Sequence, residues 1–324
     1  MSQSITWATK DYHSRASAIL ITARSQRIAD TLELGPAENS VRCISCHSPQ
    51  ETLSPASFLH NAKPDKAVSC ETCHGPAENW VRSHTRTDLS YEDRVRDGMR
   101  DLRNLYTRAG SCVACHLNVG PDILAAGHPE LSYELDGQLA AQPPHWREKS
   151  GWLGPQIWLT GQAVALRETS WQLERSPTPE LEQRWSALVW MLGKLNEGMP
   201  SLPQLGSVNG ANKYAEQRAA ADRYAKEVAG FAWTGALAKD ALVTLAQTGD
   251  DLTEENRDRA KRAEILMVSM DRLLPSAAIP EEKRKTLDSS LNELFATVQS
   301  LNDSGHKGFK TLLDRFSETL MEKD

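Results

Sequence analysis

The sequence predicts an all-α protein with two parts, a loop-rich segment over residues 1–150 and an α-helical bundle over residues 151–324. Three observations lead to this prediction. No stretch alternates apolar and polar side chains as a half-buried β-strand would. All six cysteines lie in the first 150 residues, among many Gly, Pro, Ser and Asn residues. From residue 151 onward, apolar side chains recur every three or four positions, which is the period of a helix.

In the first segment we expect only short helices, over residues 14–32, 91–107 and 129–141, with one further helical turn around each cysteine pair. In the second segment we expect six longer helices, several of which begin at a proline or after a capping residue. These helices are Pro155–Glu174, Pro179–Gly198, Ala211–Gln247, Thr253–Leu274, Pro280–Leu301 and Lys310–Glu322.

Charge argues against nucleic acid as a partner, and hydropathy argues against a transmembrane segment. The net charge is −6 and the isoelectric point is about 5.9, which argues against nucleic acid, because phosphate binding needs a basic surface. The mean hydropathy is −0.51, and no apolar run approaches the length of about 18 residues that a transmembrane helix needs. We therefore expect no transmembrane segment in this chain.

The six cysteines form three Cys-x-x-Cys pairs, and each pair is followed at once by a histidine. This pattern is typical of covalent c-type haem attachment, in which two thiols bond the porphyrin and the adjacent imidazole binds the iron. The sequence therefore predicts three c-type haems, whose porphyrins would supply the apolar interior of residues 1–150. The three motifs are Cys43, Cys46 and His47; Cys70, Cys73 and His74; and Cys112, Cys115 and His116.

Two other interpretations of the cysteines compete with haem. Four thiolates from two pairs could hold a structural zinc ion, and 23 residues separate Cys46 from Cys70, slightly more than in usual zinc ribbons. A single pair could be a redox-active dithiol. Neither alternative explains why a histidine follows every pair.

Each haem iron has a second axial position, and histidines outside the motifs are the candidates for it. His84 lies ten residues after His74, and His128 lies between Gly127 and Pro129, where the backbone is constrained. His13 opens a stretch with helical periodicity, from which it could reach a haem bound elsewhere.

Further side chains are alternatives for the same position. His60 and His145 are the reserve distal candidates, and Met99 is a minor option. His306 is expected to be solvated. Because three distal histidines suffice for three haems, the sequence predicts mainly bis-histidine ligation and no catalytic residue.

Two stretches resemble the multihaem cytochromes of the c-554 type. They are residues 68–84 (VSCETCHGPAENWVRSH) and 123–134 (ILAAGHPELSYE), and the resemblance extends over about residues 10–147. It implies closely stacked, mostly bis-histidine haems, with His13, His84 and His128 as distal ligands. Type members of that family carry four haems, one of them five-coordinate, whereas this chain has three motifs.

The resemblance implies a protein that carries single electrons between redox partner proteins. The alternative is an oxidoreductase in which one open haem iron binds a small nitrogen or sulfur species, such as nitric oxide, nitrite or hydroxylamine. Under either hypothesis, the helical bundle could dock the haem segment onto a larger complex.

A location outside the cytoplasm, such as the periplasm, is expected, because haem is attached to such motifs there. Residues 1–7 (MSQSITW) have neither the basic region nor the apolar core of a secretory signal. We therefore expect that a signal peptide has been removed from this chain.

Overall fold

The computed structural model describes residues 3–58, 63–144, 154–208, 212–252, 258–298 and 306–322. Within these ranges every regular element is a helix and there is no β-strand, so the all-α prediction is confirmed. The chain divides into two compact units. Unit 1 comprises Met1–Tyr133 and Gly137–Lys149, and unit 2 comprises Glu134–Asp136 and Ser150–Asp324.

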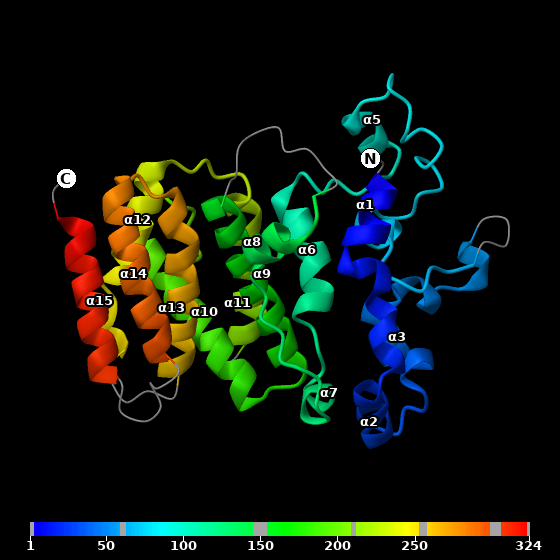
Figure 1. Ribbon diagram of the computed structural model, residues 1–324, viewed down its shortest axis with the longest axis horizontal. Helices are drawn as coiled ribbons and strands as arrows, with labels where there is room; N and C mark the ends of the chain where they lie inside the picture. The colour runs from blue at the N-terminus through cyan, green and yellow to red at the C-terminus, as the bar shows by residue number, and fades with distance from the viewer. Residues whose placement is uncertain are drawn as a thin grey trace. The chain divides into compact units, whose positions relative to one another are not determined.

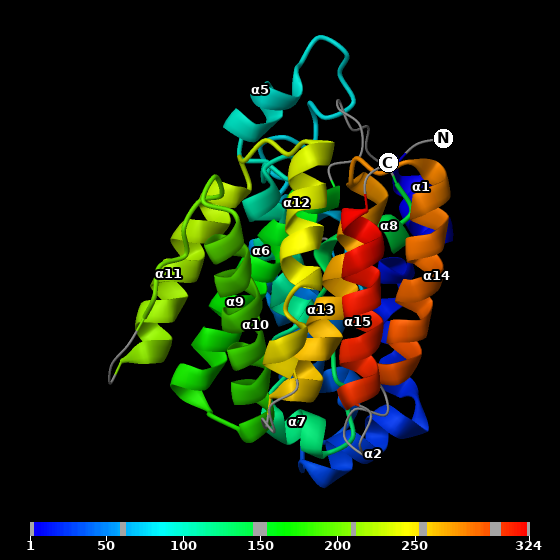
Figure 2. The ribbon, with the colours of Figure 1, turned by 90° about the vertical axis from the view of Figure 1, so that its left-hand side faces the viewer.

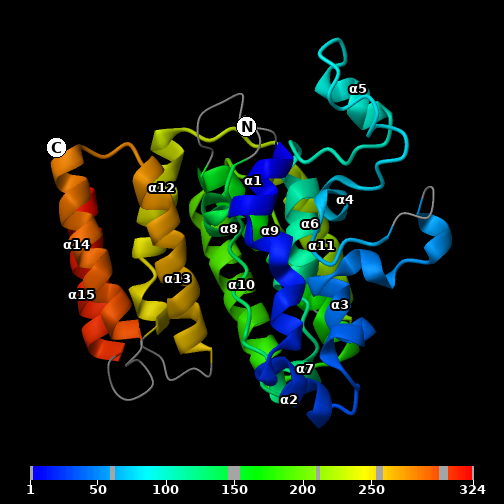
Figure 3. The ribbon, with the colours of Figure 1, turned by 45° about the vertical axis from the view of Figure 1, so that its right-hand side comes forward.

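Unit 1 is built from short helices and connecting loops (Figures 1 and 3). Its α-helices are α1 (Gln3–Lys10), α2 (Ala23–Thr31), α3 (Val41–His47), α4 (Cys70–His74), α5 (Tyr91–Arg96), α6 (Leu105–His116), α7 (Pro121–Ala125) and α8 (Leu135–Ala141), which begins in the short segment assigned to unit 2. The described part of unit 1 also contains the 3-10 helices η1 (Tyr12–Ile21), η2 (Ala37–Asn39), η3 (Pro49–Thr52) and η4 (Pro55–Ser57).

The prediction of one continuous helix over residues 14–32 is wrong. Thr22 is extended, with φ −81° and ψ 154°, and its side chain accepts a hydrogen bond from the Ser25 backbone N–H, so it ends η1 and caps α2. The residues before it form a 3-10 helix instead of an α-helix.

Two other expected helices in unit 1 are shorter than predicted. The helix over 91–107 is interrupted after α5, where Gly98 adopts a φ of +106°, and α6 starts only after Asn104, which caps it. The helix over 129–141 begins at Leu135. Helices α1 and α7 were not predicted from the sequence.

Unit 2 is a helical bundle (Figure 2). Its helices are α9 (Gly154–Arg175), α10 (Pro179–Gly198), α11 (Lys213–Val228), α12 (Gly235–Ala246), α13 (Arg259–Leu273), α14 (Glu281–Val298) and α15 (His306–Met321), with 3-10 turns η6 (Gly249–Leu252) and η7 (Leu274–Ser276). Helix α9 packs against α10 and α11, α13 packs against α10 and α14, and α15 packs against α14 and α12.

The single helix expected over Ala211–Gln247 is wrong, because the structure has two helices there. Helix α11 ends at Val228, and Thr234 then starts α12 by accepting a hydrogen bond from the Leu237 backbone N–H. Gly230 and Gly235 flank this break, as expected for residues that disfavour a helix interior.

The core of unit 2 is made by the inward faces of these helices. Trp158, Leu166, Met191, Leu245 and Phe316 are all fully buried. Burying such a side chain contributes roughly 1.5–3 kcal/mol each. Unit 2 therefore has an apolar interior made of its own side chains.

The segment Glu134–Asp136 is anchored within unit 2. The Gln162 amide donates to Glu134 Oε2 at 2.9 Å, and Arg272 Nε lies 2.8 Å from Asp136 Oδ2. Burial raises the pKa of Glu134 to about 7, with a further contribution from the negative charge of Asp136.

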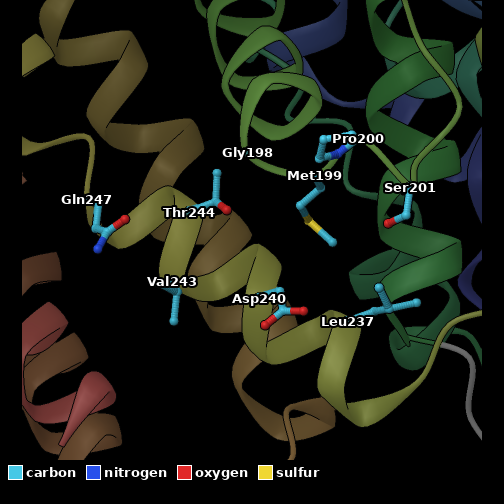
Figure 4. A pocket seen from close by; sticks show the side chains of 9 residues that line it. All are labelled: Gly198, Met199, Pro200, Ser201, Leu237, Asp240, Val243, Thr244 and Gln247. Atoms are coloured by element: carbon cyan, nitrogen blue, oxygen red, sulfur yellow. The ribbon is translucent and has the colours of Figure 1, made fainter.

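One surface cavity of unit 2, of about 520 Å³, lies between the end of α10 and one face of α12 (Figure 4). Its lining includes Met199, Leu237 and Thr244, and it contains neither a histidine nor a cysteine. Within the described ranges, no helix is both long enough and apolar enough to cross a bilayer.

Two glycines in the middle of unit 2 helices give a matched test of the packing. A Cβ on Gly161 in α9 would lie 2.8 Å from the Leu135 Cβ, whereas a Cβ on Gly193 in α10 would meet nothing within 4 Å. We expect Gly161→Ala to destabilise the protein by about 1–3 kcal/mol through overpacking. Gly193→Ala should stabilise it by about 0.5–1 kcal/mol, because alanine favours the helix. Denaturant unfolding measures both, and stabilisation by Gly161→Ala would contradict the packing described.

Candidate haem-binding site

All three Cys-x-x-Cys-His motifs occupy the C-terminal end of a helix. The histidine is the last helical residue in each case: His47 in α3, His74 in α4 and His116 in α6. Residues three positions apart lie on the same face of a helix, so the two thiols of each pair point in similar directions. None of the six cysteines forms a disulfide.

At the third motif, the ring of His116 lies close to that of His13. Their ring centroids lie 6.0 Å apart and the ring planes are nearly perpendicular, at 86°. Two imidazoles on opposite sides of one metal ion, each with a bond of about 2 Å, have centroids on the order of 6 Å apart. Burial and the nearby His13 lower the pKa of His116, which favours the neutral form that binds metals.

His13 is oriented by a carboxylate. Its Nδ1 lies 2.9 Å from Asp11 Oδ1, and the Asp11 side chain is only 3% exposed. Because an ionised carboxylate can only accept, Nδ1 carries the proton and Nε2 keeps its lone pair. This is the tautomer that binds a metal through Nε2.

At the first motif, His128 lies near His47. Burial lowers the pKa of His47, and electrostatic repulsion from His128 lowers it further. The Nδ1 of His47 donates to the Ala16 carbonyl at 3.0 Å, and the Nδ1 of His128 donates to the Pro129 carbonyl at 2.8 Å. Both histidines therefore keep Nε2 available.

The loop that carries His128 is fixed from two sides. Arg42, next to Cys43, makes two hydrogen bonds of 2.7 Å to the Asp122 carboxylate in α7. Arg24 in α2 donates to the Gly127 carbonyl at 2.9 Å. Gly127 has a φ of +107°, a conformation that glycine adopts readily and other residues rarely do.

At the second motif, His74 and His84 share a neighbour, Trp80. The Trp80 ring centroid lies 6.2 Å from that of His74 and 6.3 Å from that of His84. Trp80 is 7% exposed, and its Nε1 donates to the Pro76 carbonyl at 2.8 Å. His84 Nδ1 bonds the Val81 carbonyl. The Trp80 indole is therefore a common neighbour of His74 and His84, whereas the rings of His13 and His116 neighbour each other directly.

Two further residues contact the second motif or the cluster beside it. Met99 is buried in the cluster that contains Trp80. Arg100 donates from its backbone N–H to the His74 carbonyl at 2.7 Å, and its guanidinium donates to the Thr72 and Cys73 carbonyls at 2.9 and 2.8 Å.

The thiols show that the third motif lies next to both others. A hydrogen bond between Cys115 and Cys46 lowers the pKa of Cys46 to about 6 and raises that of Cys115. Burial, with the charge of Cys73, raises the pKa of Cys112 to about 12. Arg100 also reaches Ser111 Oγ in α6, at 3.4 Å.

Unit 1 exposes more large apolar side chains than unit 2. Tyr12, Ile21 and Val41 are 75%, 76% and 66% exposed, and the first two belong to η1, the helix that contains His13 and Ala16. Apolar side chains at such exposure fit a segment whose interior is completed by an apolar macrocycle. In the described part of the chain, the large apolar side chains exposed in unit 1 are Ile5, Tyr12, Ile19, Ile21, Val41, Leu53 and Val81, and those in unit 2 are Phe295 and Met321.

Two reserve distal candidates, His60 and His145, lie outside the described residues. His306 is the first residue of α15. The contacts of Asp11, Trp80 and Arg100 with the motif histidines and their partners were not predicted from the sequence. Only Asp11 gave a usable signal, since an Asp-x-His sequence at a helix start lets the carboxylate cap the helix and reach the histidine. Among the described side chains, no group of three or more His, Cys, Asp or Glu residues has the geometry of a metal cluster.

Comparison with known proteins supports the interpretation of the motifs. The family model described as cytochrome c554 and c-prime matches residues 2–75, which include the first two Cys-x-x-Cys-His motifs. Searches of curated proteins and of solved structures find no match to the chain. The expected resemblance to cytochrome c554 is thus confirmed over residues 2–75, and it implies that this part of the chain binds c-type haem covalently.

Proposed function

We propose that the chain is a triheme c-type cytochrome that carries single electrons between redox partner proteins outside the cytoplasm. When bound, each haem supplies a one-electron iron couple. The three cysteine pairs would anchor the haems, with His47, His74 and His116 as proximal ligands. The observation that carries the proposal is the pair His13 and His116, whose ring centroids lie 6.0 Å apart, with the Nδ1 of His13 held by Asp11.

We assign one distal histidine to each motif. His13 is assigned to the third motif because its ring centroid lies 6.0 Å from that of His116. His128 is assigned to the first, because it lies near His47 and its loop is tied to α3 through Arg42. His84 is assigned to the second, where it shares Trp80 with His74.

The hydrogen bonds of these histidines support the assignments. His13, His47, His84 and His128 each present Nδ1 to an oxygen that can only accept, as metal-bound histidines do. The neighbouring thiols of the three motifs support short distances between the cofactors. An electron could then pass along the order first, third, second motif.

A second candidate function concerns the second motif. There the ring that contacts His74 belongs to Trp80, at 6.2 Å. An iron whose distal side is not taken by an imidazole could bind a small nitrogen or sulfur species, as the oxidoreductase hypothesis requires. Of the three sites, the second motif is the one at which we would place such an iron.

Carbon monoxide separates the two candidate functions. An electron carrier with three bis-histidine haems should give the same reduced spectrum with and without the gas, because every axial position is taken. Binding of carbon monoxide to one haem of the wild-type protein would contradict simple electron transfer and favour the oxidoreductase.

Removal of single distal histidines tests the assignments. We expect His13→Gly and His128→Gly each to convert one haem per chain to a form that binds carbon monoxide, and to leave the other two unchanged. His306→Ala is the matched control, because His306 belongs to α15 of unit 2, and it should leave all spectra unchanged. If neither glycine variant bound the gas, the ligand assignments would be wrong.

A further inference from the structure

We infer that Asp11 makes the haem of the third motif the lowest-potential centre of the three, so that it is the last to be reduced. The inference rests on the proposed function, in which His13 is an axial ligand. Asp11 touches no cofactor itself and acts through the ligand, so it is a positioning residue that also tunes the iron.

Asp11 differs in kind from the groups that orient the other histidines. His47, His84 and His128 donate from Nδ1 to neutral carbonyl oxygens of Ala16, Val81 and Pro129. His13 alone among these four donates to a carboxylate, at 2.9 Å. A charge-assisted hydrogen bond is roughly twice as strong as a neutral one, so His13 is the most electron-donating imidazole of the four.

The carboxylate is buried and held in place. Its Oδ1 accepts from both the backbone N–H and the Nδ1 of His13, at 3.0 and 2.9 Å, and its Oδ2 accepts from the Gln142 amide at 3.1 Å. Because the side chain is only 3% exposed, water screens its charge weakly.

The backbone of His13 is also tied to a neighbouring segment. The Val68 N–H donates to the His13 carbonyl at 3.1 Å, and Trp7 Nε1 donates to the Val68 carbonyl at 3.1 Å. These bonds hold the backbone of His13, and the ring is held by its own bond to Asp11 Oδ1.

The sign of the effect follows from charge. Oxidised iron carries one more positive charge than reduced iron, so a fixed anion and a more basic ligand both favour the oxidised form and lower the potential. Arg100 opposes this effect mainly at the second motif, because its guanidinium lies 2.8 and 2.9 Å from carbonyls of that motif and 3.4 Å from Ser111 in α6.

The position of the third motif determines how its lower potential would affect electron transfer through unit 1. Its thiols neighbour those of the first and second motifs, so an electron that crosses unit 1 would pass through the centre that holds it least well. Electrons would reside at the first and second motifs, and the third would act as a relay between them.

A redox titration followed by electron paramagnetic resonance tests the inference on the holoprotein. The low-spin signal that disappears in His13→Gly identifies the haem of the third motif. In the wild type, this signal should be the last to vanish as the potential falls. In Asp11→Asn, which keeps an acceptor for Nδ1 and a good helix cap, the equilibrium of that haem should shift toward reduction at least tenfold, or about 59 mV.

Asp30→Asn is the matched control, since it removes the same charge from an exposed residue of unit 1, and it should shift that haem by much less. A shift in Asp11→Asn no larger than in Asp30→Asn would overturn the inference and leave the ligand assignment standing. If His13→Gly opened no iron, the assignment itself would fail. Should Asp11→Asn not fold, the order of reduction in the wild type decides, and early loss of the signal overturns the inference.

Discussion

A neutral imidazole has one nitrogen that donates a hydrogen bond and one that accepts. The proposed site requires Nδ1 to be the donor and Nε2 to keep its lone pair. An oxygen that can only accept fixes the proton on Nδ1 and leaves Nε2 as the ligand atom. In unit 1 such oxygens come from Asp11 and from the carbonyls of Ala16, Val81 and Pro129. The local folds that supply these oxygens, a 3-10 helix, a turn and a glycine-proline loop, therefore set the orientation of the histidines.

The two units differ in how their apolar interiors are formed. Unit 2 buries its own leucines, methionines and aromatic rings between long helices. Unit 1 has short helices and leaves side chains such as Tyr12, Ile21 and Val41 exposed. If three porphyrins complete unit 1, its folding is coupled to haem attachment, as the folding of small metal-binding domains is coupled to their metal. Unit 2 has no such requirement.

Much of the helical content could be predicted from the sequence, because strong periodicity and proline or threonine starts mark α9 and α10 clearly. Two of the errors occurred where one capping residue outweighs a periodic pattern. Thr22 and Thr234 each start a new helix by accepting a backbone hydrogen bond. Since threonine is common inside helices and loops alike, its capping role depends on a backbone conformation that periodicity does not report.

The motifs could be predicted in full, and their partners only in part. The spacing of Cys112, Cys115 and His116 identifies a chemical pattern within five residues. The approach of His13 to His116 depends on how segments about one hundred residues apart pack, which no local pattern encodes. The same holds for Trp80 beside His74 and His84, where a sequence count suggested a direct pair of histidines.

The central claim is that all three motifs carry covalently bound haem. Intact mass of the denatured protein, combined with a haem assay, tests this most directly. We expect the mass of the polypeptide plus three haems, and the mass of one haem less in a Cys70→Ala/Cys73→Ala variant. A wild-type mass with fewer than three haems, zinc in place of iron, or retention of all three haems in the variant would contradict the account.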